Sequence, residues 1–534
     1  MAKIFGIDLG TTYSCIAYVN DYGKPEVVSN LESSPVTPSV VAFEDTDSYS
    51  VGETAKNVLA TDPANVCSTI KRQMGKRDFT FMAFDKEYTP EAISALILKK
   101  LASDTADQLN EEVKNVVITC PAYFGMEERN ATREAGVMAG LNVLDIINEP
   151  TAAAISYGLN VNEPQTVMVY DLGGGTFDVT IINVESGKIH VLATGGNHEL
   201  GGKDWDEKVR DQIIAEYCSA TGEDAEGIRD NLEYMGELEL SSETAKKALT
   251  QRESTTVRFN GERVEVTREQ FDNMTKGLLD STIDFTRDTI AKAKSKGMKD
   301  IDKILLVGGS TMMKQVKERL TAEFPDKPIE YCDPNQSVAK GAAIYGMNVA
   351  AFPTLDPSGD ISDGEAGPEP LAPDVIDEIK NNPIFVIGGG APQKIEIVNV
   401  LSRSVAMEFV NGINNLVKRN TEIPCDVKLT AGTEVANQTT VRIRIFEDLL
   451  DDDIVPEEKC TLLAEQDLPL NPGLPAGSPV DIRVVIDKSG LLSIDVADAS
   501  SNGKSTHIEI QLQNALSEKE LKEQAELIGT LKLN

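Results

Sequence analysis

The feature that constrains this chain most is a pair of short glycine-rich turns, each entered by an aspartate and flanked by strand-forming runs. Asp8 opens the first turn and Asp171 opens the second. After each turn the chain shows, in the same order, a further strand-forming run and an alanine-rich helix, which ends at Gly158 in the first copy and at Gly346 in the second. The repeated order predicts a duplicated α/β unit whose two turns face each other across a cleft.

The residue types in the two turns suit a polyphosphate. Glycine lets the backbone approach a phosphate closely and direct successive N–H groups at it, and the threonines at positions 11, 12 and 176 add hydroxyl donors. Asp8 and Asp171 suit a Mg²⁺ ion that keeps most of its water. A tight hairpin with a capped aspartate explains one such turn alone, but two matched turns favour a nucleotide site.

Hydrolysis of a nucleotide needs more than a phosphate cradle. Phosphoryl transfer also requires neutralisation of charge and a positioned water molecule. Lys71 and Glu149 are the candidates for these roles, although a single lysine or glutamate is usually a solvated surface residue.

Composition excludes several classes of partner. The net charge is −35, from 86 acidic and 51 basic residues, and it repels nucleic acid and anionic lipid, so neither is expected as a partner. The amino terminus does not read as a signal peptide, and no run is apolar enough to span a bilayer. The seven cysteines are odd in number and scattered, which indicates a reducing compartment. We therefore expect a cytoplasmic protein.

The pattern of residues changes twice along the chain. Residues 1–349 alternate strand-forming and helical segments and are expected to form one α/β domain. Residues 350–393 are rich in proline, glycine and acids, and we interpret them as a linker or insertion in which residues 382–387 form at most one short strand.

The remainder of the chain has a β pattern followed by a short helix. Residues 402–514 contain alternating runs, such as Val441–Ile445, separated by turns at 488–490 and 502–504, which predicts a small antiparallel β-sandwich. In residues 515–534, Ser517 and Glu520 form a capping box that opens a single short helix.

Several motifs together resemble those of the seventy-kilodalton heat-shock chaperone family. They lie at residues 7–15, 121–124, 148–154, 171–178 and 307–311. The resemblance is strong over 1–349 and weaker over 394–514, and a set of several motifs is highly specific. It implies an actin-like ATPase domain with duplicated ribonuclease-H-like lobes, which uses ATP or ADP, Mg²⁺ and K⁺, and a β-sandwich that grips extended apolar peptides of unfolded proteins. Residues 394–401 then correspond to the interdomain linker.

The same resemblance assigns roles to residues of the first domain. The implied catalytic residues are Lys71, Glu149, Asp171, Thr176 and Asp178. The residues implied to hold Mg²⁺ through water are Asp8, Glu149 and Asp171. The residues implied to contact the phosphates and the adenosine are Gly10, Thr11, Thr12, Tyr13, Gly173, Gly174, Gly175, Gly201, Gly202, Glu243, Lys246, Lys247, Thr250, Gly308, Gly309 and Ser310.

Two further sets concern the peptide and the coupling between domains. The positions that match the family's peptide groove are Met407, Val410, Val441 and Ile443. A plain sandwich core explains those four equally well. The positions that match the interdomain switch and linker are Pro121, Arg129, Glu396, Val398 and Asn399.

The chain also departs from the family pattern. Asp145 stands where the family has an arginine that meets an aspartate of J-domain partners, and two facing carboxylates repel, so conventional J-domain docking is not expected. Glu396 lies in a linker that is otherwise apolar in the family, and burying it without a cation would cost a few kcal/mol of coupling energy. Residues 517–534 are too short for the family's helical lid, which predicts fast peptide exchange.

Two hypotheses follow. The first is a monomeric, lidless ATPase chaperone of this family that works with a nucleotide-exchange factor. The second keeps the fold but makes the protein an assembly or scaffold factor whose nucleotide site is mainly structural. An actin-like filament protein or a sugar kinase shares the first domain, but neither normally carries a C-terminal sandwich.

Overall fold

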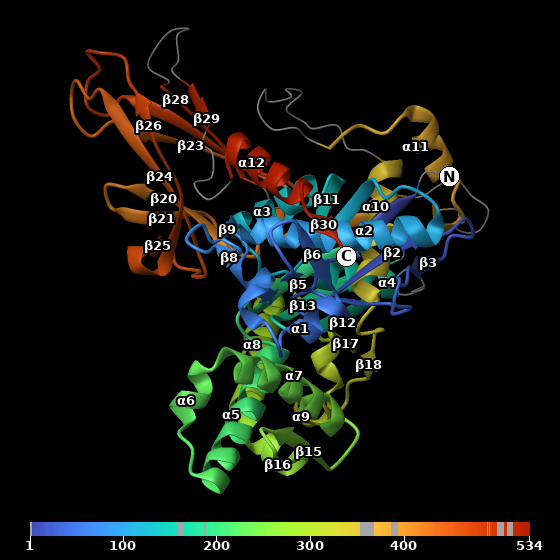
Figure 1. Cartoon of the computed structure of the whole chain (residues 1–534). Helices are drawn as coiled ribbons and strands as arrows, with labels where there is room; N and C mark the ends of the chain where they lie inside the picture. Colours follow the sequence, from blue (N-terminus) through green and yellow to red (C-terminus); the bar gives the residue numbers. More distant parts are fainter. Residues whose placement is uncertain are drawn as a thin grey trace.

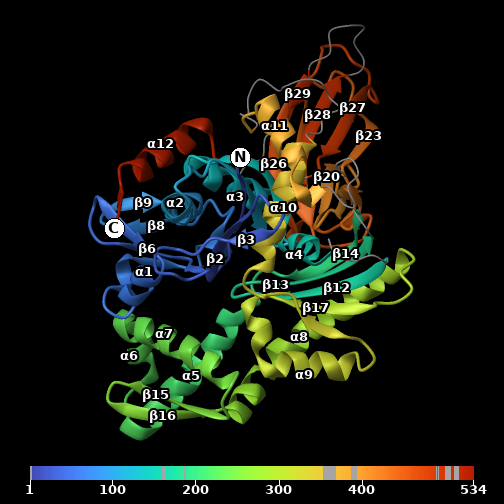
Figure 2. The ribbon, with the colours of Figure 1, turned by 90° about the vertical axis from the view of Figure 1, so that its right-hand side faces the viewer.

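A computed structural model shows how the chain folds. It describes residues 3–158, 164–185, 188–352, 368–385, 394–488, 490, 492–498, 507–509 and 516–534. Figures 1 and 2 show two α/β lobes, a β-sandwich that leans on both, and a C-terminal helix that crosses the first lobe.

Lobe I is built on a mixed sheet with the strand order β11-β10-β1-β2-β3, to which β4 adds by pairing with β2. Its strands are β1 (Ile4–Asp8), β2 (Tyr13–Val19), β3 (Pro25–Val27), β4 (Thr37–Pro38), β10 (Asn115–Cys120) and β11 (Asn142–Asn148). A second sheet and a hairpin contain β5 (Val40–Phe43), β6 (Ser48–Val51), β7 (Val66–Ser68), β8 (Phe81–Ala83) and β9 (Lys86–Tyr88). The helices are α1 (Glu53–Val58), α2 (Pro90–Leu109), α3 (Met126–Met138) and α4 (Glu149–Gly158).

Lobe II is built on a seven-stranded sheet with the order β18-β17-β12-β13-β14-β19-β22. Its strands are β12 (Gln165–Leu172), β13 (Phe177–Glu185), β14 (Lys188–Asn197), β17 (Lys303–Val307), β18 (Ile329–Tyr331), β19 (Glu396–Val400) and β22 (Glu422–Ile423), and β15 (Ser254–Phe259) and β16 (Glu262–Thr267) form a separate hairpin. The helices are α5 (Gly202–Thr221), α6 (Ala225–Asp230), α7 (Leu232–Leu249), α8 (Arg268–Ser295), α9 (Lys314–Glu323) and α10 (Ser337–Ala351).

The two lobes repeat one topology, as the paired turns predicted. In lobe I, β1 pairs antiparallel with β2 and parallel with β10; in lobe II, β12 pairs antiparallel with β13 and parallel with β17. The helices that follow are exchanged, since α4 packs on the sheet of lobe II and α10 packs on the sheet of lobe I. The two helices also contact each other and thereby join the lobes.

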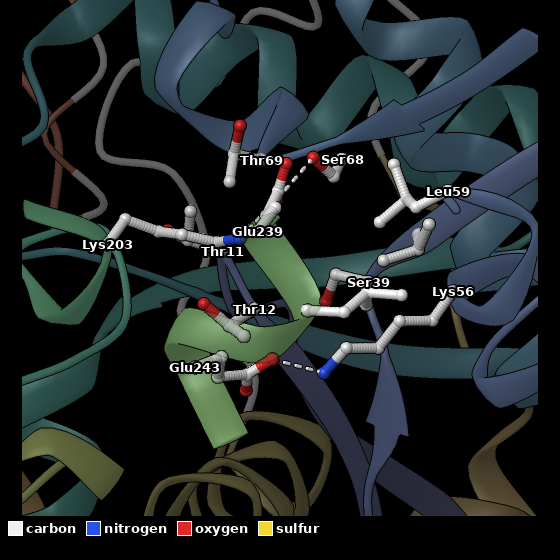
Figure 3. Close-up of a pocket in the computed structure, with 12 residues that line it drawn as sticks. Thr11, Thr12, Ser39, Lys56, Leu59, Ser68, Thr69, Lys203, Glu239 and Glu243 are labelled. Carbon is white, nitrogen blue, oxygen red and sulfur yellow. Dashed lines mark hydrogen bonds and ion pairs between the residues drawn. The ribbon is translucent and has the colours of Figure 1, made fainter. Parts of the chain in front are cut away.

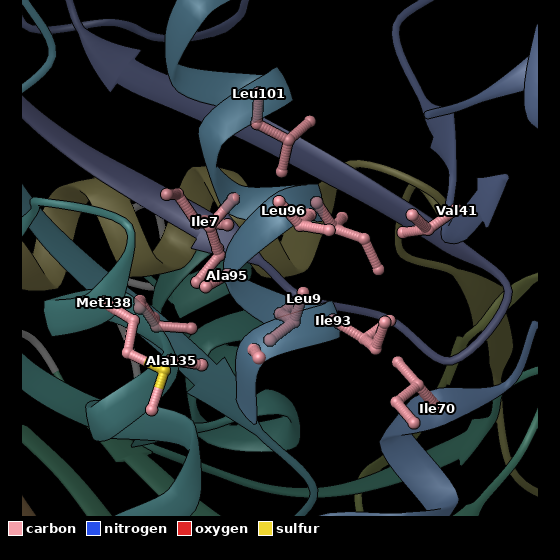
Figure 4. Packing of buried hydrophobic residues seen from close by; sticks show 14 of the residues in the cluster. Ile7, Leu9, Val41, Ile70, Ile93, Ala95, Leu96, Leu101, Ala135 and Met138 are labelled. Carbon is pink, nitrogen blue, oxygen red and sulfur yellow. The ribbon is translucent and has the colours of Figure 1, made fainter. Parts of the chain in front are cut away.

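The core of lobe I fixes the first glycine turn in place. Ile7 and Leu9, which lead into the turn, are buried in one cluster with Ile93 and Leu96 of α2 and with Ile70 (Figure 4). Because Ile70 precedes Lys71 directly, the same packing that anchors the turn also positions the candidate catalytic lysine. Protein interiors are packed too tightly for such elements to shift independently.

The sandwich contains two antiparallel sheets, as predicted. One has the order β25-β21-β20-β24-β26 and the other β23-β27-β28-β29. The strands are β20 (Ser404–Phe409), β21 (Gly412–Val417), β23 (Cys425–Gly432), β24 (Thr440–Asp448), β25 (Ile454–Val455), β26 (Cys460–Pro469), β27 (Pro479–Ile486), β28 (Leu492–Asp498) and β29 (His507–Glu509). The turn expected at 502–504 and part of the turn at 488–490 lie outside the described residues.

The segment between the two domains differs from expectation in one respect. Residues 383–385 form a short 3-10 helix where the sequence allowed one short strand, and residues 386–387 lie outside the described residues. The side chain of Asn382 causes the turn, since its Oδ1 accepts the N–H of Ile384 (3.0 Å) and its Nδ2 donates to the carbonyl of Asn20 (3.1 Å). Helix α11 (Pro373–Lys380) packs on α10 through the buried Ile379.

The C-terminal helix is present, with the expected capping box. In α12 (Glu518–Gly529), Ser517 accepts the N–H of Glu520, whose carboxylate accepts the N–H of Ser517. The helix lies on α2 and α3 of lobe I and not on the sandwich. Within the described residues, no helix combines the length and the apolar character needed to cross a membrane.

The contact between α4 and α10 predicts the effect of one methyl group. A Cβ at Gly341 would lie 1.7 Å from the carbonyl oxygen of Ala152, so the two helices would have to separate. We expect Gly341→Ala to destabilise the protein by about 1–3 kcal/mol, measured by thermal denaturation.

Gly277→Ala, in the interior of α8, is the matched control, because a Cβ there meets nothing within 4 Å. It should stabilise the helix by up to about 1 kcal/mol. Equal melting temperatures for the two variants would contradict this account of the helix contact.

Candidate nucleotide site

A cluster of buried carboxylates lies between the lobes, around one lysine. Asp8 ends β1, Glu149 begins α4, and Asp171 and Asp178 lie on the paired strands β12 and β13. Glu149, Asp171 and Asp178 are nearly inaccessible, and so is Lys71, which forms an ion pair with Glu149, whereas Asp8 is partly exposed. Their surroundings are also ordered: Thr119 donates to Asp8 (3.2 Å), and the N–H of Tyr123 donates to Asp178 (3.0 Å).

The electrostatics of the cluster show an excess of negative charge. Burial, together with the charge of Glu149, raises the pKa of Asp8 to about 7 and that of Asp178 to about 8. The pKa of Asp171 is raised well above its usual value for the same reasons. Burial disfavours the ammonium of Lys71, but Glu149 and Asp8 outweigh it and raise the pKa of Lys71. One lysine therefore does not neutralise the cluster, and a further cation is favoured there.

The two glycine turns face each other, as the sequence predicted. A Cβ on Gly174 would lie 1.9 Å from the hydroxyl of Thr12, and one on Gly175 would lie 2.4 Å from a methyl carbon of Thr11. The hydroxyl of Thr12 is buried and has no hydrogen-bond partner among the described residues. A free donor between two glycine backbones suits a phosphate oxygen.

A third and a fourth loop complete the lobe II side of the turns. Gly202 N–H donates to the carbonyl of Gly173 (2.9 Å), and Ser310 Oγ donates to the same carbonyl (2.8 Å). Gly308 has a φ of 80°, and a Cβ there would lie 2.5 Å from Oδ1 of Asp171, so only glycine fits this close approach. Lys246 donates to the carbonyl of Gly202 (2.8 Å).

A charged group bridges the two lobes across the cleft. Glu243 of lobe II forms ion pairs with Lys56 of lobe I and with Lys247 (2.7 Å). Tyr13 donates to Glu243 (3.1 Å) and accepts from both lysines. Burial raises the pKa of Glu243, but the two lysines outweigh that effect and lower it well below its ordinary value.

Figure 3 shows the pocket beside this group. The lining residues labelled there are Thr11, Thr12, Ser39, Lys56, Leu59, Ser68, Thr69, Lys203, Glu239 and Glu243. Ser68 of lobe I donates to Glu239 of lobe II (3.3 Å), and Arg72 of lobe I contacts Asp204 of lobe II (2.6 Å). Sequence reasoning predicted Thr11, Thr12 and Glu243 but missed residues such as Lys56, Ser68 and Arg72, because lone Ser, Lys and Arg positions carry no motif. Only the position of Arg72 next to Lys71 was a signal.

The structure does not bring every predicted residue to the cleft. Thr250 donates its hydroxyl to the carbonyl of Lys247 at the end of its own helix (2.7 Å), and Gly309 is exposed beside Gly308. Within the described residues no group of three or more His, Cys, Asp or Glu side chains forms a cluster able to hold a metal ion directly. Asp8, Glu149 and Asp171 still fit a hydrated Mg²⁺, because such an ion is bound largely through its own water.

A chain of contacts leads from the carboxylate cluster to the sandwich. Asp178 accepts the N–H of Tyr123, which lies two residues after Pro121. The carbonyl of the next residue, Phe124, accepts from Arg129 (3.1 Å) and from Ser402 of the sandwich (2.8 Å). The predicted switch residues therefore lie between the cleft and the second domain.

A second contact between the domains is ionic. Arg403 pairs with Glu128 of α3 (2.6 Å) and with Glu447 of β24 (3.2 Å). Glu447 also accepts the N–H of Met126 (3.0 Å). Burial opposes the charge of Arg403, but the two glutamates raise its pKa.

Asp145 lies in the interface and not on the surface. Its side chain is 1% exposed and accepts from Tyr345 of α10 (2.7 Å), and Lys488 of the sandwich lies 3.4 Å away. Arg133 of α3 is 4.0 Å away. The expected picture of an outward carboxylate that repels a partner does not describe this arrangement, because Asp145 is covered and surrounded by cations.

The strand β19 of the linker shows whether the charge of Glu396 is buried without a cation. β19 pairs parallel with β14 of lobe II and antiparallel with β22, so the sheet of lobe II continues into the segment that begins the sandwich. Glu396 is exposed and pairs with Lys188 (3.1 Å), so its charge is not buried at a cost. Val398 pairs in register with His190, and Asn399 accepts from Thr151 (3.3 Å).

The four candidate groove residues divide into two groups. Met407 (1% exposed) and Ile443 (3%) belong to the sandwich core, which is the alternative that the sequence left open. Val441 is partly buried at the edge of that core, and Val410 is 84% exposed at the turn between β20 and β21. Only Val410 and Val441 therefore present apolar surface.

The fold and the site together define a class of protein: a two-lobed nucleotide-binding domain with a docked β-sandwich. The model of the Hsp70 protein family matches residues 4–351 and 386–528. Proteins named "Chaperone protein DnaK" from two strains of Halobacterium salinarum, R1 and NRC-1, are each 35% identical over 536 residues, covering 98% of this chain and 77% of the relative. The chain belongs to the Hsp70 family. It is an ATP-dependent chaperone and an ATPase that uses ATP and Mg²⁺.

The raised pKa of Asp8 predicts a pH-dependent stability in protein free of nucleotide and metal. A raised carboxyl pKa contributes stability below the unfolded value of about 4, and this contribution is lost as the pH rises through about 7. Asp8→Asn has no ionisable group at this position, so the variant does not lose this stability as the pH rises. We expect the variant to gain stability over wild type between about pH 4 and pH 7, by at most about 4 kcal/mol, in scanning calorimetry with a chelator.

The exposed Asp78→Asn is the matched control and should show no such trend. Mg·ADP should stabilise the wild type more than Asp8→Asn. A difference between Asp8→Asn and wild type that stays constant with pH would contradict the account of the cluster.

Proposed function

We propose that Lys71 and the carboxylates around it carry out ATP hydrolysis, with the phosphates held between the two glycine turns. The observation that carries this proposal is the buried Lys71–Glu149 pair, enclosed by three aspartates of raised pKa directly below the facing turns. A bound Mg²⁺ supplies charge neutralisation at the phosphates, and Asp8, Glu149 and Asp171 are the residues that would hold its water molecules.

The residues of this chain then have distinct roles. The ammonium of Lys71, which stays charged, orients a water oxygen for attack and compensates negative charge in the transition state. Thr12 donates its unpaired hydroxyl to a phosphate, and Thr176 lies in the opposite turn with a comparable hydroxyl. Asp178 couples the charge of the cluster to the backbone at Tyr123. Binding of K⁺ beside these groups remains a proposal that rests on the family resemblance.

Removal of the lysine tests this mechanism. Lys71→Ala should lower the single-turnover rate of ATP hydrolysis by about 10²–10³-fold, the usual loss for one electrostatic group at a transition state. The exposed Lys76→Ala, in the same segment, should hydrolyse at the wild-type rate. Equal rates for Lys71→Ala and wild type would favour the alternative function, a scaffold factor whose nucleotide site is structural.

We further propose that the sandwich binds extended apolar segments of unfolded proteins. An extended segment gains affinity from strand-like backbone pairing and from pockets for alternate side chains. Val410 and Val441 support this proposal, because they leave apolar surface near the β20–β21 turn. A nucleotide-exchange factor as partner, a monomeric state and a cytoplasmic location complete the proposal by family resemblance.

The interface supports a specific route of coupling. When the sandwich is docked, Lys488 offsets the charge of the covered Asp145; when it leaves, Arg133 and Tyr345 are the partners that remain on the first domain. A further cation lowers the cost of a buried carboxylate, so this pair favours docking. We propose that a conventional J-domain does not engage Asp145 in the docked arrangement, where the carboxylate is covered.

An exchange of charges tests the Asp145–Lys488 pair. Asp145→Asn or Lys488→Gln alone should favour undocking, each by about 1–3 kcal/mol, seen as a larger radius of gyration in small-angle scattering. The double variant Asp145→Lys with Lys488→Asp should recover part of that loss, because the pair is restored with reversed signs. A double variant as undocked as the sum of its parts would refute the pairing.

A further inference from the structure

A second cavity lies between the lobes, beside the pocket of Figure 3. Its walls are residues 68–72 of lobe I and the helices α5 and α7 of lobe II, and its volume is about 130 Å³. We call it the side cavity. A single water molecule needs about 10–15 Å³ of such space, so the side cavity has room for several water molecules or for one small polyatomic ion.

The side cavity adjoins the space in front of the first glycine turn. The pocket of Figure 3, which Thr11 and Thr12 line, has a volume of only about 10 Å³. The residues that line both spaces are Ser68, Thr69, Lys203 and Glu239. One contact between the lobes lies at this boundary, since Ser68 donates to Glu239 (3.3 Å). An ion that leaves the first glycine turn on this side passes these residues and enters the side cavity.

Two cationic residues of the side cavity are bonded directly to the second glycine turn. The N–H of Lys203 donates to the carbonyl of Gly174 (2.8 Å), and Nε of Arg72 donates to the carbonyl of Gly175 (3.0 Å). The wall of the side cavity is therefore built onto the turn that holds phosphates in the proposed function.

Two buried donors of the side cavity lack a partner. Ser242 of α7 is fully buried, and its Oγ has no hydrogen-bond partner among the described residues. The same holds for Nε of Arg210 in α5, whose ion pair with the exposed Glu207 is loose (3.8 Å). A buried donor without an acceptor is costly, so these two donors favour an occupant with several acceptor oxygens.

The other charges at the side cavity form close pairs. These pairs are Lys203 with Glu239, Lys246 with Asp206, and Arg72 with Asp204. Among the described residues that line the side cavity, this leaves Arg210 as the cation for an anion to approach, with Glu207 exposed beside it. The cluster around Lys71 carries an excess of negative charge instead. A phosphate ion is therefore repelled less in the side cavity than beside the cluster, and near-neutral surroundings hold it weakly.

We propose that the side cavity is a binding site for inorganic phosphate, and that the phosphate cleaved from ATP leaves the cleft through it. The planar guanidinium of Arg210 matches two oxygens of a tetrahedral oxyanion, and Ser242 donates to a third. The exit role rests on the proposed function, whereas the binding of phosphate does not.

Titration of the nucleotide-free protein with inorganic phosphate tests the site. We expect Arg210→Gln to weaken phosphate binding by at least about tenfold, because a charged, forked donor is lost. The measurement is the broadening of the phosphate signal in phosphorus NMR, at fixed ionic strength and with a chelator. Lys208→Gln, at an exposed position of the same helix, removes an equal charge and should bind phosphate as the wild type does. Arg210→Lys keeps the charge without the fork and should recover only part of the loss.

Thr12→Val distinguishes the side cavity from the glycine turns, because Thr12 lines the pocket of Figure 3 and not the side cavity. Phosphate binding that Thr12→Val abolishes and Arg210→Gln leaves unchanged would overturn the proposal, since the ion would then lie between the turns. Absence of phosphate binding by the folded wild type would overturn it as well, because water alone would then fill the side cavity.

Ser242→Ala provides a second measurement with effects of opposite sign. Without phosphate, the variant should melt at the wild-type temperature or above it, because a buried donor that lacks a partner is removed. With phosphate, its melting temperature should rise less than that of the wild type, because the ion binds less tightly. A variant that melts well below the wild type and still gains as much from phosphate would contradict the role of Ser242 as a donor.

Single-turnover hydrolysis tests the exit role. Arg210→Gln should lower the rate of phosphate release relative to the rate of ATP cleavage by about three- to tenfold, because the cation that attracts the leaving anion is lost. A fluorescent phosphate-binding sensor reports release, and acid quenching reports cleavage. Lys208→Gln should keep the wild-type ratio, and an equal ratio in Arg210→Gln would overturn the exit role. If the wild type cleaves no ATP, the proposed function fails together with the exit role, while the phosphate titration still decides whether the site exists.

Discussion

The excess of buried negative charge around Lys71 is the interaction on which the other features depend. Four carboxylates share one lysine, and burial raises the pKa values of Asp8, Asp171 and Asp178. Such a cluster is costly unless another cation arrives. The proposed function places Mg²⁺ beside these carboxylates, and the positive charge of that ion would offset their excess negative charge.

The same cluster is connected mechanically to the second domain. Asp178 holds the backbone at Tyr123, and the carbonyl of Phe124 in the same turn accepts from Ser402 of the sandwich. The sheet of lobe II extends through β19 to β22, so the linker is part of a rigid layer. A short path of covalent and hydrogen bonds therefore connects the charges in the cleft to the sandwich. The exchanged helices α4 and α10 contact each other and hold the two lobes together.

Much of the fold was predictable from the sequence because glycine turns and alternating apolar residues report local geometry. The facing turns, the duplicated sheets, the sandwich and the capping box of α12 follow from patterns within a few residues. The ion pair between Lys56 and Glu243 joins positions far apart in the chain and leaves no local signal. The burial of Met407 and Ile443 was open for a related reason, since alternation shows that residues share a face but not which face is covered.

Charge was the least predictable property. Asp145 was expected to repel a partner carboxylate, and the cost of Glu396 depended on whether it is buried without a cation; the structure covers Asp145 and exposes Glu396. Both outcomes have one cause: the partners, Lys488 and Lys188, are set by the packing of the domains and by strand register. The position of α12 was unpredictable as well, because its amphipathic pattern fits either domain.

The most direct test of the central claim is a calorimetric titration of folded, nucleotide-free protein with ADP, with and without Mg²⁺, at pH 7 and pH 8. The account predicts binding that is much tighter with Mg²⁺. It also predicts release of protons on binding, because the raised carboxyl groups ionise when the metal ion arrives. Binding that is indifferent to Mg²⁺, or the absence of any nucleotide binding by folded protein, would contradict it.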